Sequence, residues 1–240
     1  MNKLLIFAGA GISAESGLKT FRDDGGIWTT NNVNELCNYH TFTRSKNDEN
    51  KRRQIFDFYN YRKKETLKVD SNLAHQKIAE WQKEYGKNRV KIVTSNIDNL
   101  FEKAGVEDVV HVHGDLENMH CVACQHKWAK DEYDYMERCP KCNSRLTKPH
   151  VVFFGERAPE YMKMHSIFNH KKRGKEDIIL VIGTSFEVIS AETIVQRKNI
   201  NTILINKDET IQDNWFNHKL IGLATEKILE AEFIIKNSLK

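Results

Sequence analysis

Residues 3–14 have the sequence KLLIFAGAGISA, and this stretch decides the fold class. Its first part, Lys3–Ala8, is a short continuous apolar run, which is typical of a strand buried on both faces of a parallel sheet. Gly9 and Gly11 allow a tight turn and a close approach of the backbone to a ligand. A helix that begins after this turn would direct free N–H groups at a phosphate. The usual phosphate-binding pattern is G-x-G-x-x-G, and Ala14 stands at its last glycine position, which the looser form of the pattern allows. A tight turn without a ligand is therefore an alternative.

Four more apolar runs indicate further strands. Most of them are rich in Val, Ile and Leu and end in a small or polar residue. They are Val90–Thr94, Val109–His111, Ile178–Ile182 and Thr202–Ile205. Helical patterns lie between some of them, and Leu73–Tyr85 is the clearest because polar capping residues precede it and Gly86 follows it. Strands that alternate with helices predict an α/β fold with a Rossmann-like parallel sheet and helices on both faces.

Two segments do not follow this alternation. Residues 34–69 are polar and then helical around Gln54–Leu67, and residues 117–148 contain most of the cysteines and little periodicity. We interpret them as a helical insert and a metal-binding module that together form a smaller lobe. The prediction is a single domain, 1–240, in which the Rossmann-like lobe comprises 1–33, 70–116 and 149–240. The parallel sheet is expected to resume near Val151.

The composition is that of an ordinary globular protein, with 240 residues, 40% of them hydrophobic and 29% charged. The net charge of +4 is small, and the basic clusters Lys51–Arg53 and Arg62–Lys64 are typical of a solvated helix face. We therefore expect no nucleic-acid partner. The sequence has no apolar run of about 18 residues, and its first apolar run is too short for a signal peptide. We expect a cytoplasmic protein with no membrane partner, and a monomer because long terminal extensions are missing.

Four cysteines form two C-x2-C pairs with 14 residues between the pairs. They are Cys121, Cys124, Cys139 and Cys142. Disulfides are not expected in a chain without an export signal. Four thiolates form a closed tetrahedral site for one Zn²⁺, which is structural rather than catalytic. The spacing falls just below the usual range for a zinc ribbon, so a redox pair and a nucleic-acid zinc ribbon are the alternatives.

The segment that begins at the glycine turn, GAGISAESGLKTFRDDGGIW over Gly9–Trp28, resembles the N-terminal signature of the sirtuins, the NAD-dependent protein-lysine deacylases. Further motifs of that family follow in the family's order, and the cysteine pairs match its zinc module. These motifs are TSNID at Thr94–Asp98, HG at His113-Gly114, VVFFGE at Val151–Glu156, and GTS at Gly183–Ser185 followed by Val188.

The resemblance implies that NAD is the co-substrate. The positions that it assigns to NAD binding are Gly9, Ala10, Gly11, Ser13, Phe21, Arg22, Trp28, Ser95, Asn96, Ile97, Asp98, Gly183, Thr184, Ser185, Asn206, Lys207, Asp208 and Ala224. From its chemistry alone, Arg22 could hold a pyrophosphate with two hydrogen bonds. Ser95 stands where the family usually has Gln, which predicts a lower affinity for NAD.

The resemblance also implies three catalytic residues. His113 acts as the general base on the ribose hydroxyls, after the acyl oxygen of the substrate has displaced nicotinamide from the ribose. Asn96 orients the ribose and the catalytic water, and Asp98 recognises the nicotinamide carboxamide. The products are nicotinamide, the deacylated lysine and 2′-O-acyl-ADP-ribose. Without the resemblance, an Asx turn or a cap with no ligand is the favoured interpretation of Asn96 and Asp98.

Two segments indicate how an acyl-lysine protein or peptide is bound. The first is the substrate strand Val152, Phe153, Phe154, Gly155 and Glu156, again by resemblance. The second is Tyr59 and Arg62, which share a helix face at i and i+3 and resemble the Y-x-x-R motif of sirtuins that remove succinyl and malonyl groups. A guanidinium can pair with the terminal carboxylate of such an acyl group. Alternatively, Tyr59 packs in the core and Arg62 joins a basic helix face.

The predicted function is therefore NAD-dependent removal of succinyl or malonyl groups, and also of acetyl groups, from protein lysines. Three other functions remain as alternatives: a plain deacetylase, an NAD-cleaving or ADP-ribosylating enzyme of sirtuin type, and a zinc-ribbon binding module without catalysis.

Overall fold

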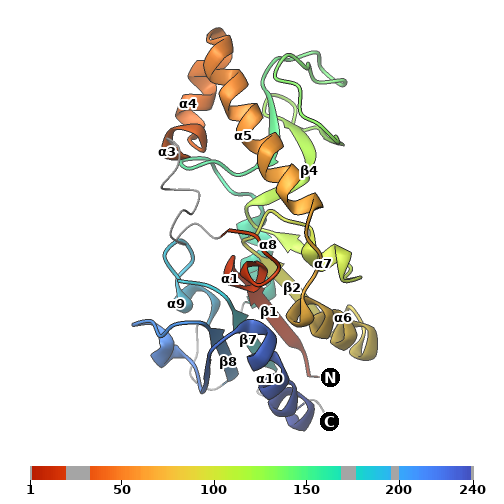
Figure 1. The fold of residues 1–240 in the computed structure, drawn as a ribbon, viewed down its shortest axis with the longest axis vertical. Coiled ribbons are helices and arrows are strands. Elements are labelled where there is room, and N and C mark those ends of the chain that lie inside the picture. Colours follow the sequence, from red (N-terminus) through yellow and green to blue (C-terminus); the bar gives the residue numbers. More distant parts are fainter. Residues whose placement is uncertain (1, 20–32, 169–176, 196–199, 239–240) are drawn as a thin grey trace.

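A six-stranded parallel sheet forms the centre of the larger lobe in this computed structural model, which describes residues 2–19, 33–168, 177–195 and 200–238 (Figure 1). Its strand order is β3-β2-β1-β7-β8-β9. The bounds are β1 Leu4–Ala8, β2 Val90–Thr94, β3 Val110–His111, β7 Ile178–Ile182, β8 Asn201–Asn206 and β9 His218–Ile221. The five predicted strands are all present, with small shifts at their ends. The sixth, β9, was missed because its polar start, His218-Lys219, interrupts the apolar pattern.

Helices cover both faces of this sheet, as predicted. On β1, Leu4 and Ile6 pack into a core cluster with α6 (Leu73–Tyr85), α7 (Leu100–Lys103) and α10 (Ala224–Ser238). The alternate residues Leu5 and Phe7 pack on the other face with α8 (Glu160–Phe168) and α9 (Ala191–Ile194). Successive side chains of a strand point to opposite faces, so a continuous apolar run supplies both cores.

Helix α6 has the predicted bounds, and its two ends explain them. The Asn72 side chain accepts hydrogen bonds from the N–H groups of Ala74 and His75, which are among the donors that a helix start leaves without partners. Gly86 ends the helix with φ +87°, a conformation that glycine adopts without strain.

A second group of elements lies at the other end of the molecule, beyond the carboxyl ends of the parallel strands (Figure 1). They are α3 Val33–Leu36, α4 Tyr39–Arg44, a 3-10 turn Ser45–Asn47, α5 Glu49–Leu67, β4 Gly114–Cys121, β5 Lys127–Ala129 and β6 Thr147–Val151. The three strands form an antiparallel sheet in the order β5-β4-β6. Side chains from α5, β4 and the segment after β6 share one apolar cluster, which includes Phe56, Met119 and Phe153.

The expectation that the parallel sheet resumes near Val151 is wrong. Val151 ends β6, which pairs antiparallel with β4, and the parallel sheet resumes only at β7. The reason lies at Gly114, which pairs with Val151 and has φ +79°. A Cβ atom there would lie 1.9 Å from the carbonyl oxygen of His150, so only glycine allows β4 and β6 to approach this closely.

The expectation that the basic clusters of α5 are solvated is also wrong for three of their residues. Arg52, Lys63 and Arg62 are buried, with 2%, 4% and 9% exposure. The guanidinium of Arg52 donates to the carbonyl oxygens of Tyr135 and Thr147, and Lys63 Nζ donates to that of Lys130. Buried charges need such partners. Arg52 and Lys63 therefore attach α5 to the cysteine-containing segment.

Among the described residues, the structure has no helix that is both long and apolar enough to cross a membrane.

Candidate active site

The glycine turn lies where the strand order of the parallel sheet reverses, between β1 and β7, a position at which open α/β sheets bind ligands. The N–H of Gly9 donates to the Ile182 carbonyl at 2.9 Å, and that of Gly11 donates to the Gly183 carbonyl at 2.8 Å. A Cβ on Gly9 would lie 2.6 Å from the Gly183 carbonyl oxygen. Gly183 has φ +66°, and a Cβ there would lie 2.3 Å from the Ile12 nitrogen. The glycines therefore allow two strand ends to touch backbone to backbone.

The helix expected after this turn is short. Helix α1 spans only Gly11–Ala14, and the N–H groups of Ile12 and Ser13 donate to the carbonyls of Gly9 and Ala10. These two N–H groups already have hydrogen-bond partners within the turn. They are therefore not the free donors for a phosphate that the sequence suggested.

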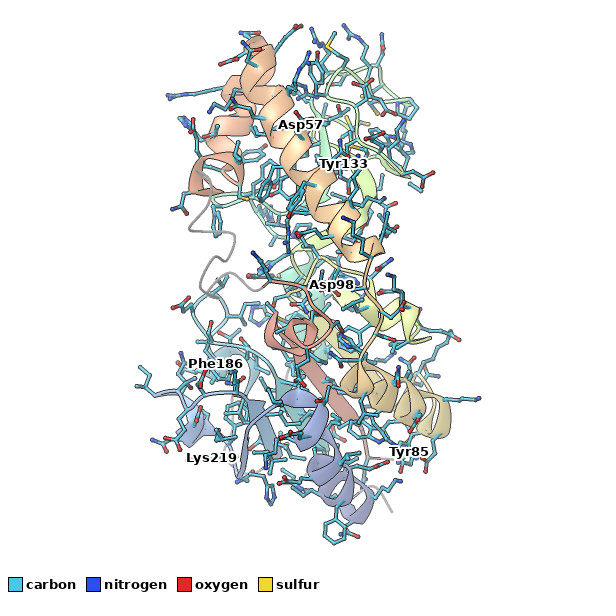
Figure 2. All side chains as sticks on the ribbon, viewed as in Figure 1. Asp57, Tyr85, Asp98, Tyr133, Phe186 and Lys219 are labelled. Atoms are coloured by element: carbon cyan, nitrogen blue, oxygen red, sulfur yellow. The ribbon has the colours of Figure 1, made fainter. Side chains whose placement is uncertain are left out.

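Ser13, Asn96 and Asp98 form a buried polar cluster beneath the glycine turn. The Ser13 hydroxyl donates to Asp98 Oδ2 at 3.0 Å, and Asn96 Nδ2 donates to Ser13 Oγ and to the Gly9 carbonyl at 3.1 Å each. Burial raises the pKa of Asp98, and hydrogen bonds from the Leu100 N–H and from Ser13 oppose this effect. The Leu100 contact is the Asx turn that the sequence left as an alternative. Figure 2 shows Asp98 at the level where the two lobes meet.

His113 lies two residues after β3 and is held through both ring nitrogens. Nδ1 lies 3.1 Å from the carbonyl oxygen of Ser95, and Nε2 lies 2.9 Å from the hydroxyl of Tyr161 on α8. Burial lowers the pKa of His113, and the Ser95 carbonyl partly offsets this. The imidazole is therefore neutral near pH 7, as a general base must be. Tyr161 belongs to no motif, and sequence reasoning did not find it.

The carboxyl ends of β7 and β8 are joined by one side chain. Asn206 Oδ1 accepts the N–H of Thr184 at 3.0 Å, and its Nδ2 donates to the Thr184 carbonyl at 2.8 Å. Asn206 thus fixes the loop of Gly183, Thr184 and Ser185.

The other predicted NAD positions differ in exposure. Ala10, Ser95, Ile97 and Ser185 are half-buried, whereas Lys207 and Asp208 are exposed. Ala224 is buried in the core cluster where α10 begins. Phe21, Arg22 and Trp28 lie outside the described residues.

The predicted substrate strand begins next to His113, since the N–H of Val152 donates to the His113 carbonyl at 2.8 Å. One edge is paired with the segment before α4: the N–H of Phe154 donates to the Cys37 carbonyl, and the N–H of Tyr39 donates to the Phe154 carbonyl. Phe153 is buried, whereas Phe154 is 45% exposed. Gly155 is exposed and has φ +79°.

Glu156 ends this segment and folds back on it. Its Oε2 atom accepts the N–H of Phe153 at 2.9 Å and lies 3.0 Å from Nζ of the buried Lys148. Lys148 is a second contact residue that no sequence motif indicated.

Tyr59 and Arg62 share the face of α5 that meets the substrate strand. The Tyr59 ring is buried and stacks on Phe153, with 5.3 Å between centroids and 7° between planes. Its hydroxyl lies 3.3 Å from the Cys37 sulfur. Arg62 Nη1 lies 2.7 Å from the carboxylate of Glu65. Tyr59 is thus a core residue, as the structural alternative proposed, but one in contact with the substrate strand.

The four paired cysteines come together as predicted. Their sulfur atoms all lie within 4.8 Å of one another, and all four are free thiols. The two pairs have the same local turn: Gln125 N donates to the Cys121 carbonyl and Asn143 N to that of Cys139, and both donor residues have positive φ. Four sulfur ligands at this separation fit one tetrahedral Zn²⁺, so the cluster is consistent with a structural zinc site.

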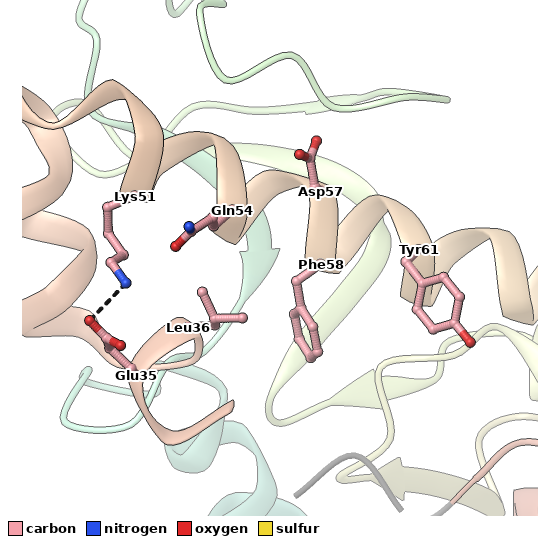
Figure 3. Close-up of a pocket in the computed structure, with 7 residues that line it drawn as sticks. All are labelled: Glu35, Leu36, Lys51, Gln54, Asp57, Phe58 and Tyr61. Atoms are coloured by element: carbon pink, nitrogen blue, oxygen red, sulfur yellow. Dashed lines mark ion pairs between the residues drawn. The ribbon is translucent and has the colours of Figure 1, made fainter. Parts of the chain in front are cut away.

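A surface pocket of about 510 Å³ lies between α3 and α5 (Figure 3). Its lining residues are Glu35, Leu36, Lys51, Gln54, Asp57, Phe58 and Tyr61. None of them is a predicted site residue, so this pocket is separate from the residues around His113.

The chain is similar in sequence and in structure to proteins of one known family. The model of the Sir2 family matches residues 9–190. An NAD-dependent protein deacylase of Helicobacter hepaticus is 36% identical over 255 residues, which cover 97% of this chain and 96% of that protein. A solved structure of a Sir2 homologue in complex with NAD has a TM-score of 0.79 at 30% identity, over 99% of this chain and 91% of the other. A Sir2 structure with a deacetylated p53 peptide and 3′-O-acetyl ADP-ribose has a TM-score of 0.73 at 25% identity, over 97% and 93%.

Proposed function

Because this chain belongs to the Sir2 family and is an NAD-dependent protein deacylase, we propose that it prefers acyl-lysines whose acyl group ends in a carboxylate, such as succinyl and malonyl, and that it also removes acetyl groups. The observation that carries the preference is the stacking of Tyr59 on Phe153, because it brings the Tyr59/Arg62 face of α5 against the substrate strand.

NAD fits the residues at the reversal point of the sheet, where the glycine turn, the cluster of Ser13, Asn96 and Asp98, and the loop fixed by Asn206 surround the carboxyl ends of β1 and β7. When bound, NAD supplies the ribose carbon that takes up the acyl oxygen as nicotinamide leaves. Asn96 and Asp98 are held by Ser13, so they bind and orient NAD with little reorganisation of their side chains.

His113 removes the proton of a ribose hydroxyl through Nε2. Its Nδ1 faces a carbonyl oxygen, which can only accept, so the ring proton sits on Nδ1 and the lone pair on Nε2. The Val152 hydrogen bond to the His113 backbone keeps the substrate strand beside this base. The four cysteines hold one Zn²⁺ that stabilises the small lobe and takes no part in the reaction. We assign 34–69 and 117–148 to that lobe.

Arg62 recognises the terminal carboxylate of the acyl group. Its side chain is 11% exposed, and a charge pair is stronger in such a partly buried place than in water. Glu65 already contacts Nη1 and therefore competes with the substrate. A guanidinium has five N–H donors, so Arg62 can hold both carboxylates or exchange one for the other.

The experiment is mass spectrometry of one peptide that carries either succinyl- or acetyl-lysine, incubated with enzyme with and without NAD. Three variants accompany the wild type: Arg62→Met, Glu65→Gln and Lys64→Met. Lys64 is the matched control, because it is an exposed cation on the same helix, paired with Glu132. We expect the wild type to remove succinyl faster than acetyl, in both cases only with NAD. Arg62→Met should reduce the rate of succinyl loss by about 10-fold or more, and Lys64→Met should leave that rate unchanged.

Glu65→Gln should increase the preference for succinyl, because it removes the competing carboxylate. Equal rates for both acyl groups in the wild type and in Arg62→Met would mean that Tyr59 and Arg62 are structural and the protein is a plain deacetylase. Consumption of NAD without loss of either acyl group would overturn deacylation and favour NAD cleavage or ADP-ribosyl transfer.

A further inference from the structure

Tyr161 contacts the atom of His113 that the reaction requires. Its hydroxyl lies 2.9 Å from Nε2, and the two rings are 5.9 Å apart between centroids with a tilt of 40°. Tyr161 is the second residue of α8 and comes five residues after Glu156, so it enters the site from a different element than the substrate strand does.

The direction of this hydrogen bond follows from the other side of the ring. Nδ1 faces the Ser95 carbonyl at 3.1 Å, and a carbonyl oxygen has no proton to give, so Nδ1 carries the hydrogen. In the neutral ring Nε2 then has only a lone pair. The Tyr161 hydroxyl must be the donor, and burial raises its pKa, so it stays protonated at neutral pH.

We propose that Tyr161 is a positioning residue for His113: its hydroxyl occupies the Nε2 lone pair in the free enzyme and gives up this place to a ribose hydroxyl of the bound dinucleotide. The proposal rests on the role of His113 in the proposed function, and it names the group that prepares this base. It involves no bond making or breaking, only the exchange of one hydroxyl donor for another.

The surroundings of the ring favour this arrangement. Tyr161 is the titratable group that contacts the ring, and in the described part of the chain the ring forms no ion pair. The Ser95 carbonyl follows β2, and the His113 backbone is fixed to Val152. With both ring nitrogens bonded, the imidazole is held in one orientation and one tautomer before the substrate arrives.

A hydroxyl that donates to Nε2 stabilises the neutral ring. Removing it should therefore make His113 easier to protonate in the free enzyme. Once a ribose hydroxyl has replaced Tyr161, the same substitution should have no effect on the ring. If Tyr161 only packed against His113, replacing it by phenylalanine would leave the pKa of His113 in the free enzyme unchanged, because phenylalanine retains the ring.

The test is NMR titration of protein labelled with ¹⁵N-histidine, in which the ring nitrogens report tautomer and protonation directly. Wild type, Tyr161→Phe and the control Tyr85→Phe are titrated alone and with saturating ADP-ribose, which carries the ribose hydroxyls. Tyr85 packs on the opposite core cluster and is not in contact with His113. The signal is assigned by its loss in His113→Asn.

We expect Nδ1–H in the free wild type, and a pKa of His113 that is higher by about 0.5 to 1 pH unit in Tyr161→Phe. Tyr85→Phe should match the wild type, and the difference should vanish with ADP-ribose. An equal pKa in the free wild type and Tyr161→Phe, an Nε2–H tautomer, or a difference that persists with ADP-ribose would each overturn the proposal. Deacylation is measured separately. An inactive wild type that gives the expected titrations would refute the proposed function and leave the Tyr161 contact standing.

Discussion

The ammonium of Lys148 lies 3.0 Å from the carboxylate of Glu156, and the lysine side chain is only 2% exposed. The same carboxylate oxygen accepts the N–H of Phe153, and Lys148 also donates to the carbonyl of Val151. One ion pair therefore joins the end of the substrate strand to the residue that precedes it, and the Lys148 ammonium also lies 4.4 Å from the centroid of the Phe153 ring.

Removing one member of this pair should destabilise the protein strongly, because the other charge stays buried without a partner. Lys148→Met or Glu156→Gln should each lower the free energy of unfolding by about 3 to 5 kcal/mol, and the double variant by less than the sum. Urea unfolding measures this, with Lys64→Met at an exposed pair with Glu132 as the control, expected below about 1 kcal/mol. Strictly additive effects would show that the two groups do not depend on each other.

Loss of one cluster cysteine should release the metal. We expect one Zn²⁺ per chain in the wild type and none in Cys139→Ser, with a small lobe that becomes sensitive to proteases. Elemental analysis and limited proteolysis measure the two effects. Cys37→Ser is the matched control, since Cys37 is buried outside the cluster beside Tyr59, and it should keep its zinc. A full complement of zinc in Cys139→Ser would refute the four-cysteine site.

The buried ring of His75 should make the protein sensitive to mild acid. Burial lowers its pKa from 6.5 to about 4. Between these values the unfolded chain binds the proton and the folded chain does not, so the free energy of unfolding falls as the pH falls from about 6.5 to 4. In His75→Leu this contribution, at most about 3 kcal/mol, should be missing. Urea unfolding at pH 7, 5.5 and 4.5 measures the two slopes, and identical slopes would contradict the burial argument.

Alanine substitutions at Gly183 and Gly105 distinguish the cost of crowding from the cost of backbone strain. Both have positive φ, but a Cβ at Gly105 meets no atom within 4 Å, whereas one at Gly183 lies 2.3 Å from the Ile12 nitrogen. Gly105→Ala should cost about 1 to 2 kcal/mol, and Gly183→Ala about 1 to 3 kcal/mol more. Gly183→Ala should also weaken NAD binding, because it moves the glycine turn. Thermal unfolding and a titration with NAD measure both, and equal losses of stability would refute the crowding argument.

The sequence predicted those features that depend on local pattern. The apolar runs identified five strands of the parallel sheet, and the C-x2-C pairs identified the thiol cluster. Both patterns can be recognised within short stretches of consecutive residues. Asn96 and Asp98 were found through a motif, and the structure adds that Ser13 holds both of them.

The features that were missed depend on contacts between distant segments. Tyr161 and Lys148 lie in segments with no distinguishing pattern, and only the fold brings them to His113 and Glu156. Arg52 and Lys63 resemble surface cations in sequence, and their carbonyl partners are 67 or more positions away. β6 was misassigned because an apolar ending does not reveal which sheet a strand joins.

The place of β1 in the sheet has a consequence for synthesis on the ribosome. β1 emerges before both of its partner strands, yet it lies in the interior of the sheet, with Leu4 paired to Val90 on one side and to Ile178 on the other. The chain between these two partners takes on the order of ten seconds to translate. During that time one edge of an apolar strand stays open, which is the state that aggregates most readily. Chaperones that bind extended apolar segments are therefore expected to act on the nascent chain until β7 has emerged.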